Sequence, residues 1–285
     1  MDGADRGLRC VMHGDGAAYP VRRLLLINMP VDRALHLRPL TKMAAPAWRC
    51  PTCQSGHLRL MPKSILSIQT AETKQAANEQ WFDADHVRLR FAAVLVCDNG
   101  SCGEPASLSG TGLVSEEPDD DMQNSVYVEY FVPDHFRPSP ALIDIPAQCP
   151  SEVAEELKLA FIASWGDFAA SGNHIRTAAE HLLTALRVRK TVTAKTGKKS
   201  WMTLHARIEK VEASHPTVSQ SLFAIKWLGN AGSHSGELTR ENVYDALDIF
   251  ENVLHELYVN HARAIKKLVT AVNRRKGPIR RRAPF

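Results

Sequence analysis

Four cysteines in the N-terminal half of the chain have the spacing of a metal site. They form two close pairs, Cys50 and Cys53 in the sequence CPTC, and Cys97 and Cys102 in the sequence CDNGSC. A zinc ion takes four thiolates from two turns, and a closed site of this kind stabilises a module whose own core is too small to fold alone. The gap between the pairs is longer than the roughly 15 to 20 residues of a compact ribbon. The pattern predicts a structural zinc ion, because a catalytic one would need an open coordination position and a nearby acid.

The six cysteines of the chain are also enough for three disulfide bridges, which would require an oxidising compartment. The apolar run LLLINMPV has the length of a signal-peptide core. It lies behind an acidic, glycine-rich start, however, and no small-residue cleavage pattern follows it. We therefore expect a cytoplasmic protein with Cys10 and Cys149 as free thiols. No apolar run approaches the roughly 18 residues of a membrane helix, so no membrane partner is expected.

Alternating side chains predict strands around both cysteine pairs. Residues 87–91 place Val, Leu and Phe between arginines on the way to Cys97, and residues 58–68 follow Cys53 with a mixed alternation. A further strand is expected for SVYVEYF, residues 125–131. Together these segments predict a small β-rich, zinc-ribbon-like module over residues 43–132.

The C-terminal half follows a helical period. Apolar residues recur at three-and-four spacing over residues 243–258, and Thr239 precedes them as a capping residue, so a helix is expected to begin near Arg240. Upstream, Pro150 marks the entry to a first helix, and the sequence Ser171-Gly172-Asn173 is expected to break the chain before a second one. Two more helical segments lie between these and Thr239. About five helices are predicted to form an all-α bundle.

Composition divides the chain further. Residues 1–42 have no helical or strand period and are predicted to be a disordered tail, or an overextended start ahead of Met43, which begins MAAPAWRCPTC. The proline-rich residues 133–150 are expected to be a stiff, extended linker. The helical bundle is predicted over residues 151–262 and a basic tail over residues 263–285.

The cationic charge of the protein is concentrated at its C-terminus. The net charge is +4, but residues 263–285 contain nine Lys or Arg and no acid, which leaves −5 for the rest of the chain. Such a segment attracts phosphate backbones through counterion release, and a solvated tail that aids solubility is the alternative. The candidate nucleic-acid-binding residues of this segment are Arg274, Arg275, Lys276, Arg280, Arg281 and Arg282.

Taken in order, these motifs resemble a known family. The CxxC pair, the second cysteine pair, YF before a proline-rich segment, and then NHIRTAAEHLLTAL, LHARIEKVEA and KWLGNAGSHSG look like the domain-of-unknown-function family 4145, which often carries N-terminal zinc knuckles. The resemblance extends from Cys50 to Tyr258. This family is considered similar to the HEPN superfamily of helical domains, which occur in restriction, toxin and phage-defence systems and often bind or act on RNA. The resemblance implies a HEPN-like bundle, a protein partner from a defence or restriction system, and a homodimer as one assembly.

The resemblance also implies candidate catalytic residues. HEPN ribonucleases carry an arginine, a polar residue, three other residues and a histidine on one helix. The arginine holds a phosphate and the histidine moves protons, without a metal ion. The matching residues here are Asn230 and His234, but Gly229 stands in place of the arginine. Lys226 lies one turn before Asn230 and could supply the missing cation.

Each of these positions also has an ordinary structural explanation. Glycine and asparagine are favoured where helices end, so Asn230 could cap a turn and His234 could satisfy backbone carbonyls. Arg176 and Glu180, one turn apart in the second helix, are the other specific mark of the family. They could equally form a surface pair of small energy.

The sequence therefore predicts an α+β protein, with a small β-rich zinc-ribbon-like module followed by an all-α HEPN-like helical bundle. Because Gly229 replaces the arginine, the function that we expect is a non-catalytic module that binds RNA or DNA, or a protein partner. The alternative is a metal-independent ribonuclease, with His234 as acid or base and with Lys226 and Arg176 as phosphate clamps. A purely structural role in a larger assembly is a third hypothesis.

Overall fold

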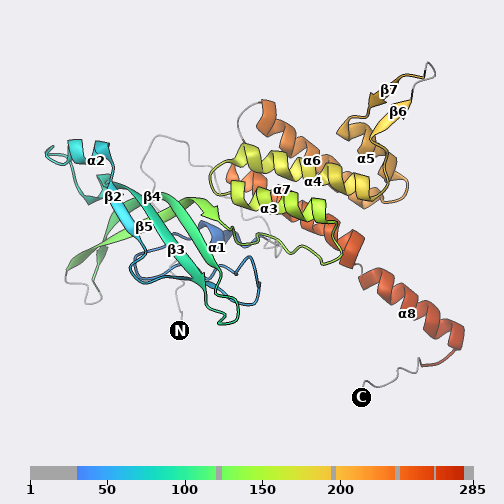
Figure 1. The fold of residues 1–285 in the computed structure, drawn as a ribbon, viewed down its shortest axis with the longest axis horizontal. Coiled ribbons are helices and arrows are strands. Elements are labelled where there is room, and N and C mark those ends of the chain that lie inside the picture. The colour runs from blue at the N-terminus through green and yellow to red at the C-terminus, as the bar shows by residue number, and fades with distance from the viewer. Residues whose placement is uncertain (1–30, 120–123, 194–196, 235–237, 260, 279–285) are drawn as a thin grey trace, which may run out of the picture.

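A curled antiparallel sheet from the N-terminal part of the chain is followed by helices from the C-terminal part (Figure 1). The computed structural model describes residues 31–119, 124–193, 197–234, 238–259 and 261–278. The prediction of mixed α and β structure, with the sheet first, is confirmed for these residues.

The sheet is built on its longest-range pairing, which joins β3 to two short strands and to β4. Along the sheet the order is β1-β3-β4-β5, all antiparallel, and β2 pairs with another stretch of β3. Every second side chain of β3 is buried, as the alternation of arginine with apolar residues predicts. The elements of this part are α1 (Arg33–Leu37), β1 (Leu58–Leu60), β2 (Leu66–Gln69), α2 (Ala71–Ala76), a 3-10 turn (Ala84–His86), β3 (Arg88–Cys97), β4 (Pro105–Pro118) and β5 (Ser125–Arg137).

The helical part begins where the sequence predicts. Pro150 precedes the first helix, and Thr239 caps α7 in a reciprocal capping box with Asn242, whose amide accepts from the Thr239 backbone. The elements of this part are α3 (Ser151–Ala163), α4 (Phe168–Ala185), the hairpin strands β6 (Thr191–Thr193) and β7 (Lys199–Trp201), α5 (Leu204–Glu212), α6 (Pro216–His234), α7 (Arg240–Leu254), a π-helical turn (His255–Val259) and α8 (His261–Arg275).

Two hydrophobic cores organise the molecule. One core lies within the helices, and the other lies against the sheet. Trp165, which directly follows α3, belongs to the sheet core, where its ring meets Trp48 at 5.6 Å and Phe136 at 5.1 Å between centroids. Its indole N–H donates to the Ser139 hydroxyl at 2.9 Å. A helical-part residue therefore anchors the two parts to each other.

The structure corrects the expectation of a tail up to residue 42. The Val31 amide donates to the buried carboxylate of Asp248 in α7 at 2.8 Å, and Leu40 pairs with Phe131 of β5. Arg33 lies 2.8 Å from the same carboxylate. Residues 31–42 are thus packed between the sheet and the helices, because their apolar side chains and one arginine have partners far along the sequence. Residues 1–30 lie outside the described part of the chain.

The expected break at Ser171-Gly172-Asn173 is wrong, because α4 runs through it without interruption. The Ser171 hydroxyl donates to the carbonyl of Ala160 in α3 at 2.9 Å, which satisfies the group that would otherwise compete with the helix. Gly172 is buried, and a Cβ there would meet Leu238 at 2.7 Å. Both small residues allow close packing rather than ending the helix.

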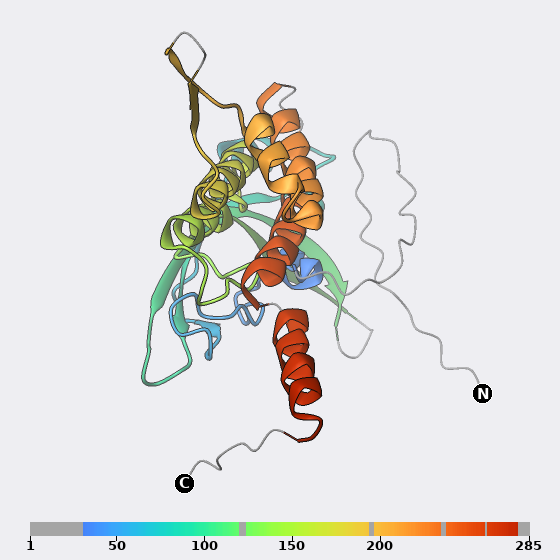
Figure 2. The same ribbon diagram turned by 90° about the vertical axis from the view of Figure 1, so that its right-hand side faces the viewer.

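The proline-rich segment and the basic tail also differ from expectation. β5 continues to Arg137, and Leu142 and Ile143 are buried in the helical core, so residues 133–150 are a packed connection rather than an extended spacer. Residues 261–275 form α8, which extends away from the other helices (Figures 1 and 2). None of the described helices is long and apolar enough to cross a membrane.

Candidate functional site

The four cysteines of the two pairs meet at one end of the sheet. The thiol sulfurs of Cys50, Cys53, Cys97 and Cys102 all lie within 4.8 Å of one another. The Sγ atoms of Cys50 and Cys102 are 3.8 Å apart, and those of Cys53 and Cys97 are 3.6 Å apart. The prediction that these four residues come together is confirmed.

Strand pairing explains how a separation of 43 residues is closed. The first pair lies in the loop before β1, and Leu58 of β1 stands opposite Cys97 at the end of β3. Within the first loop, the Cys50 amide donates to the Gly56 carbonyl at 2.9 Å. In the second loop, the Cys102 amide donates to the Asn99 carbonyl at 2.9 Å. The residues between the pairs form β1, β2 and β3, so the intervening length does not separate the thiols.

Backbone and side-chain donors surround the sulfurs. The Gly56 amide donates to Cys53 Sγ at 3.4 Å, and the Asn99 amide donates to Cys97 Sγ at 3.4 Å. Hydrogen bonding by the Ser55 hydroxyl and the Gly56 amide lowers the pKa of Cys53 to about 5, whereas burial raises the pKa of Cys97 to about 12. The crowded thiols cannot all ionise by themselves, and a bound cation would allow all four to be thiolates.

The distances fit a tetrahedral thiolate site. Metal–sulfur bonds of about 2.3 Å place tetrahedral sulfurs roughly 3.8 Å apart, close to the two sulfur–sulfur distances in the cluster. Asp98 ties the two loops together, since its carboxylate accepts from the His57 amide at 2.7 Å and lies 3.0 Å from Arg59 Nε. Such supporting contacts fix the orientation of metal ligands. The cluster is therefore compatible with a closed metal site.

The predicted catalytic positions lie along α6 and α4. A Cβ added at Gly229 would lie 3.8 Å from the Cβ of Arg176, so the position of the missing arginine adjoins a natural one on α4. Lys226 places its ammonium 3.7 Å from the ring centroid of its neighbour Trp227. The backbone of Asn230 and His234 belongs to α6, and their side chains lie outside the described residues.

Arg176 and Glu180 form the surface pair that was the ordinary explanation for them. Arg176 Nε is 3.8 Å from a Glu180 carboxylate oxygen, and both side chains are exposed by more than a third. A pair of this exposure contributes little to stability. Of the basic C-terminal residues, Arg274, Arg275 and Lys276 are exposed. Arg280, Arg281 and Arg282 lie outside the described residues.

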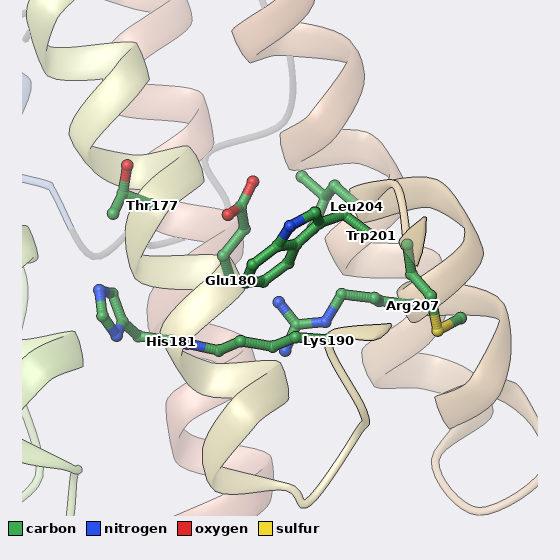
Figure 3. A pocket seen from close by; sticks show the side chains of 8 residues that line it. Thr177, Glu180, His181, Lys190, Trp201, Leu204 and Arg207 are labelled. Carbon is green, nitrogen blue, oxygen red and sulfur yellow. The ribbon is translucent and has the colours of Figure 1, made fainter. Parts of the chain in front are cut away.

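A pocket that the sequence did not predict lies between α4, α5 and the β6–β7 hairpin (Figure 3). Its volume is about 160 Å³. Only Glu180 among its residues was a sequence candidate, because the others are brought together from three separate elements without a local motif. It is lined by Thr177, Glu180, His181, Lys190, Trp201, Met202, Leu204 and Arg207.

Comparison with family models divides the chain as the fold does. Residues 38–138 match the model of a family described as Domain of unknown function (DUF8608), and residues 158–275 match that of Domain of unknown function (DUF4145). The resemblance to family 4145 thus holds for the helical part and includes α8. The cysteine pairs fall in the DUF8608 match instead. Comparison with curated proteins and with solved structures gives no match.

Proposed function

We propose that this protein is a non-catalytic nucleic-acid-binding module, in which α8 contacts the phosphate backbone of RNA or DNA. The proposal rests on the exposure of Arg274, Arg275 and Lys276 at the end of a helix that extends away from the bundle (Figure 2). No acidic residue occurs from position 263 onward to neutralise these cations. A projecting cationic helix gains affinity for phosphates by releasing counterions from the nucleic acid.

The same helix offers a surface for a protein partner. Four apolar side chains at three-and-four spacing are exposed on α8, by 36% to 57%. A helix that is basic on one face and apolar on another suits a module that binds nucleic acid while attached to a protein, of the kind found in defence or restriction systems, or to a second copy of itself. The apolar stripe consists of Ile265, Leu268, Val269 and Val272.

A zinc ion held by the four cysteines is the second part of the proposal. Its role would be structural, because four thiolates complete a tetrahedral shell and leave no position for a substrate. Zinc is preferred to iron because the neighbouring loops show the short knuckle form with amides donating to sulfur. Elemental analysis of the purified protein should find about one zinc ion per chain, and iron in its place would refute this assignment.

The nucleic-acid part is tested by removing the exposed cations of α8. We expect Arg274, Arg275 and Lys276, changed together to Ala, to weaken binding to RNA or DNA and to reduce the slope of log affinity against log salt by roughly 2 to 3. A matched control changes three exposed lysines elsewhere, Lys74, Lys158 and Lys210, to Ala. Equal slopes for the two triple variants would refute the role of α8.

A metal-independent ribonuclease remains the second candidate, because Arg176 adjoins the position where Gly229 replaces an arginine. In that hypothesis a cation from α4 would hold the phosphate and His234 would move the proton. Incubating the full chain with mixed RNA in the presence of a chelator separates the candidates. Cleavage that is lost in His234→Ala would favour the ribonuclease, and binding without cleavage would favour the module.

A further inference from the structure

A buried arginine opens onto the pocket between α4, α5 and the β6–β7 hairpin without a carboxylate bonded to it. Arg207 is 4% exposed, and its Nη2 donates to the Thr184 hydroxyl at 2.8 Å and the Val188 carbonyl at 3.4 Å. Within the described part of the chain, its Nε has no hydrogen-bond partner. A buried cation is costly unless an anion compensates it. The nearest acid of the pocket, Glu180, pairs with Arg176.

Two further side chains give the pocket the character of a binding site. Lys190 lies on the hairpin side and points toward α4, where His181 lies, and Arg207 points into the same space (Figure 3). Trp201 lines the pocket although 78% of it is exposed, so its indole is a ring surface without a cover. Large exposed aromatics of this kind commonly mark binding surfaces.

The size of the pocket decides which part of a ligand fits inside. Its volume of about 160 Å³ is close to that of an apolar cavity of roughly 150 Å³ that accommodates one benzene. A single phosphate group fits this space, and a whole nucleotide does not. A base attached to that phosphate would lie outside, within reach of the exposed Trp201.

We propose that this pocket binds the phosphate of a nucleotide, with Arg207 and Lys190 holding the phosphate and Trp201 stacking on the base. Guanidinium groups bind phosphate through paired, charge-assisted hydrogen bonds, and lysine adds a point charge. Tryptophan stacks on any base because every base has a π-face. The nucleotide is either free or the phosphorylated end of a strand, since both present the same groups.

Glu180 limits the charge that the pocket accepts. Two cations and one carboxylate line it, so a single phosphate is balanced, whereas the additional charges of a triphosphate would be repelled by Glu180. The Glu180 carboxylate can instead accept hydrogen bonds from ribose hydroxyls or base amino groups. We therefore expect a preference for a nucleoside monophosphate over the triphosphate.

Calorimetric titration of the full chain at low salt tests the ligand class. Adenosine monophosphate should bind at least about tenfold more tightly than adenosine, because the charge-assisted hydrogen bonds to phosphate are lost with the nucleoside. A 5′-phosphorylated oligonucleotide that binds better than its 5′-hydroxyl form identifies a strand end as the source. Equal affinity of those two with tight monophosphate binding identifies the free nucleotide. Equal affinity for monophosphate and nucleoside would overturn the proposal.

Variants then locate the binding. Lys190→Ala and Trp201→Ala, both at exposed positions, should each weaken monophosphate binding by about tenfold. The matched controls are Lys199→Ala on the neighbouring strand and Trp81→Ala on the sheet part, neither of which lines the pocket. If a pocket variant and its control bind equally, the site is wrong. Unchanged monophosphate binding by the triple α8 variant would show that this site is independent of the proposed nucleic-acid surface.

Discussion

Gly56 lies where the two cysteine loops approach each other most closely. A Cβ at this position would be 2.6 Å from Cys97 Sγ and 2.9 Å from the Cβ of Asn99. We expect Gly56→Ala to push the loops apart and weaken metal binding by about 10- to 100-fold, as loss of supporting contacts around a metal does. Competition with a chromogenic chelator measures this change.

Gly100→Ala is the control for that substitution. It adds the same methyl group in the neighbouring loop, where nothing lies within 4 Å. Metal affinity should therefore be unchanged in Gly100→Ala. If both variants release the metal equally, crowding at Gly56 is not what determines the affinity.

His36 makes stability depend on pH at the contact between the two parts. Its ring packs on Trp165 and Tyr244, and burial lowers its pKa to about 4 from 6.5, although Asp32 opposes the shift. Between these values the unfolded chain binds a proton that the folded chain does not, so stability falls as pH drops from 6.5 to 4. The loss amounts to about 3 kcal/mol.

His36→Phe keeps a ring at this position and removes the titration. Denaturant unfolding at pH 7 and at pH 4.5 should show a smaller loss of stability in the variant than in the original chain. Cysteine and carboxylate titrations occur in both proteins and cancel in the difference. Parallel pH profiles would mean that His36 is not buried in its neutral form.

Residue types were predictable from the sequence where their chemistry is local. CPTC and CDNGSC indicated the four cysteines, because each pair forms one loop. His36 and Arg207 gave no such signal. Their properties come from burial by residues of other elements, and no spacing along the chain encodes that burial.

Among the elements, α1 carries an ion pair that holds it to α7. Arg33 Nη1 is 2.8 Å from Asp248 Oδ2, and the Asp248 side chain is 2% exposed. Its further pairs with Glu241 and Asp245 are half exposed and contribute less. We expect Arg33→Ala to lower the free energy of unfolding by about 3 kcal/mol, because it leaves a buried carboxylate without its cation.

The exposed Arg38 supplies the control, since Arg38→Ala removes the same charge just after α1. Thermal unfolding should distinguish the two variants clearly. Similar melting temperatures would show that the Arg33 pair is as weak as an ordinary surface pair. The comparison also measures what residues 31–42 contribute, which composition alone assigned to a tail.

The elements themselves were predicted where periodicity is strong. The start of α7 and the alternation of β3 follow from Thr239 and from the spaced apolar residues. The errors occurred where tertiary contacts override a local signal. Ser171 and Gly172 read as a break but are satisfied by α3 and Leu238, and α1 is too short for a periodic pattern.

At the scale of the whole molecule, two separate cores predict that the two parts respond differently to loss of metal. The buried residues of the sheet core include Cys50 and Cys97, whereas those of the helical core include no metal-site cysteine. Removing a metal ion from the cluster should therefore unfold the sheet part and leave α3 to α7 protected. Trp165 is the residue through which the loss would reach the helices, because it packs in the sheet core.

Hydrogen exchange on the full chain, with and without chelator, measures this response. Amides of β1, β3 and β4 should lose protection first, followed by the end of α3 near Trp165, while the centres of α4 and α7 exchange slowly throughout. Cys50→Ala should reproduce the effect of the chelator, and Cys149→Ala, which lies against the helical core, should not. Uniform protection in all states would mean that the four thiols meet without a metal, and that the sheet core is stable by packing alone.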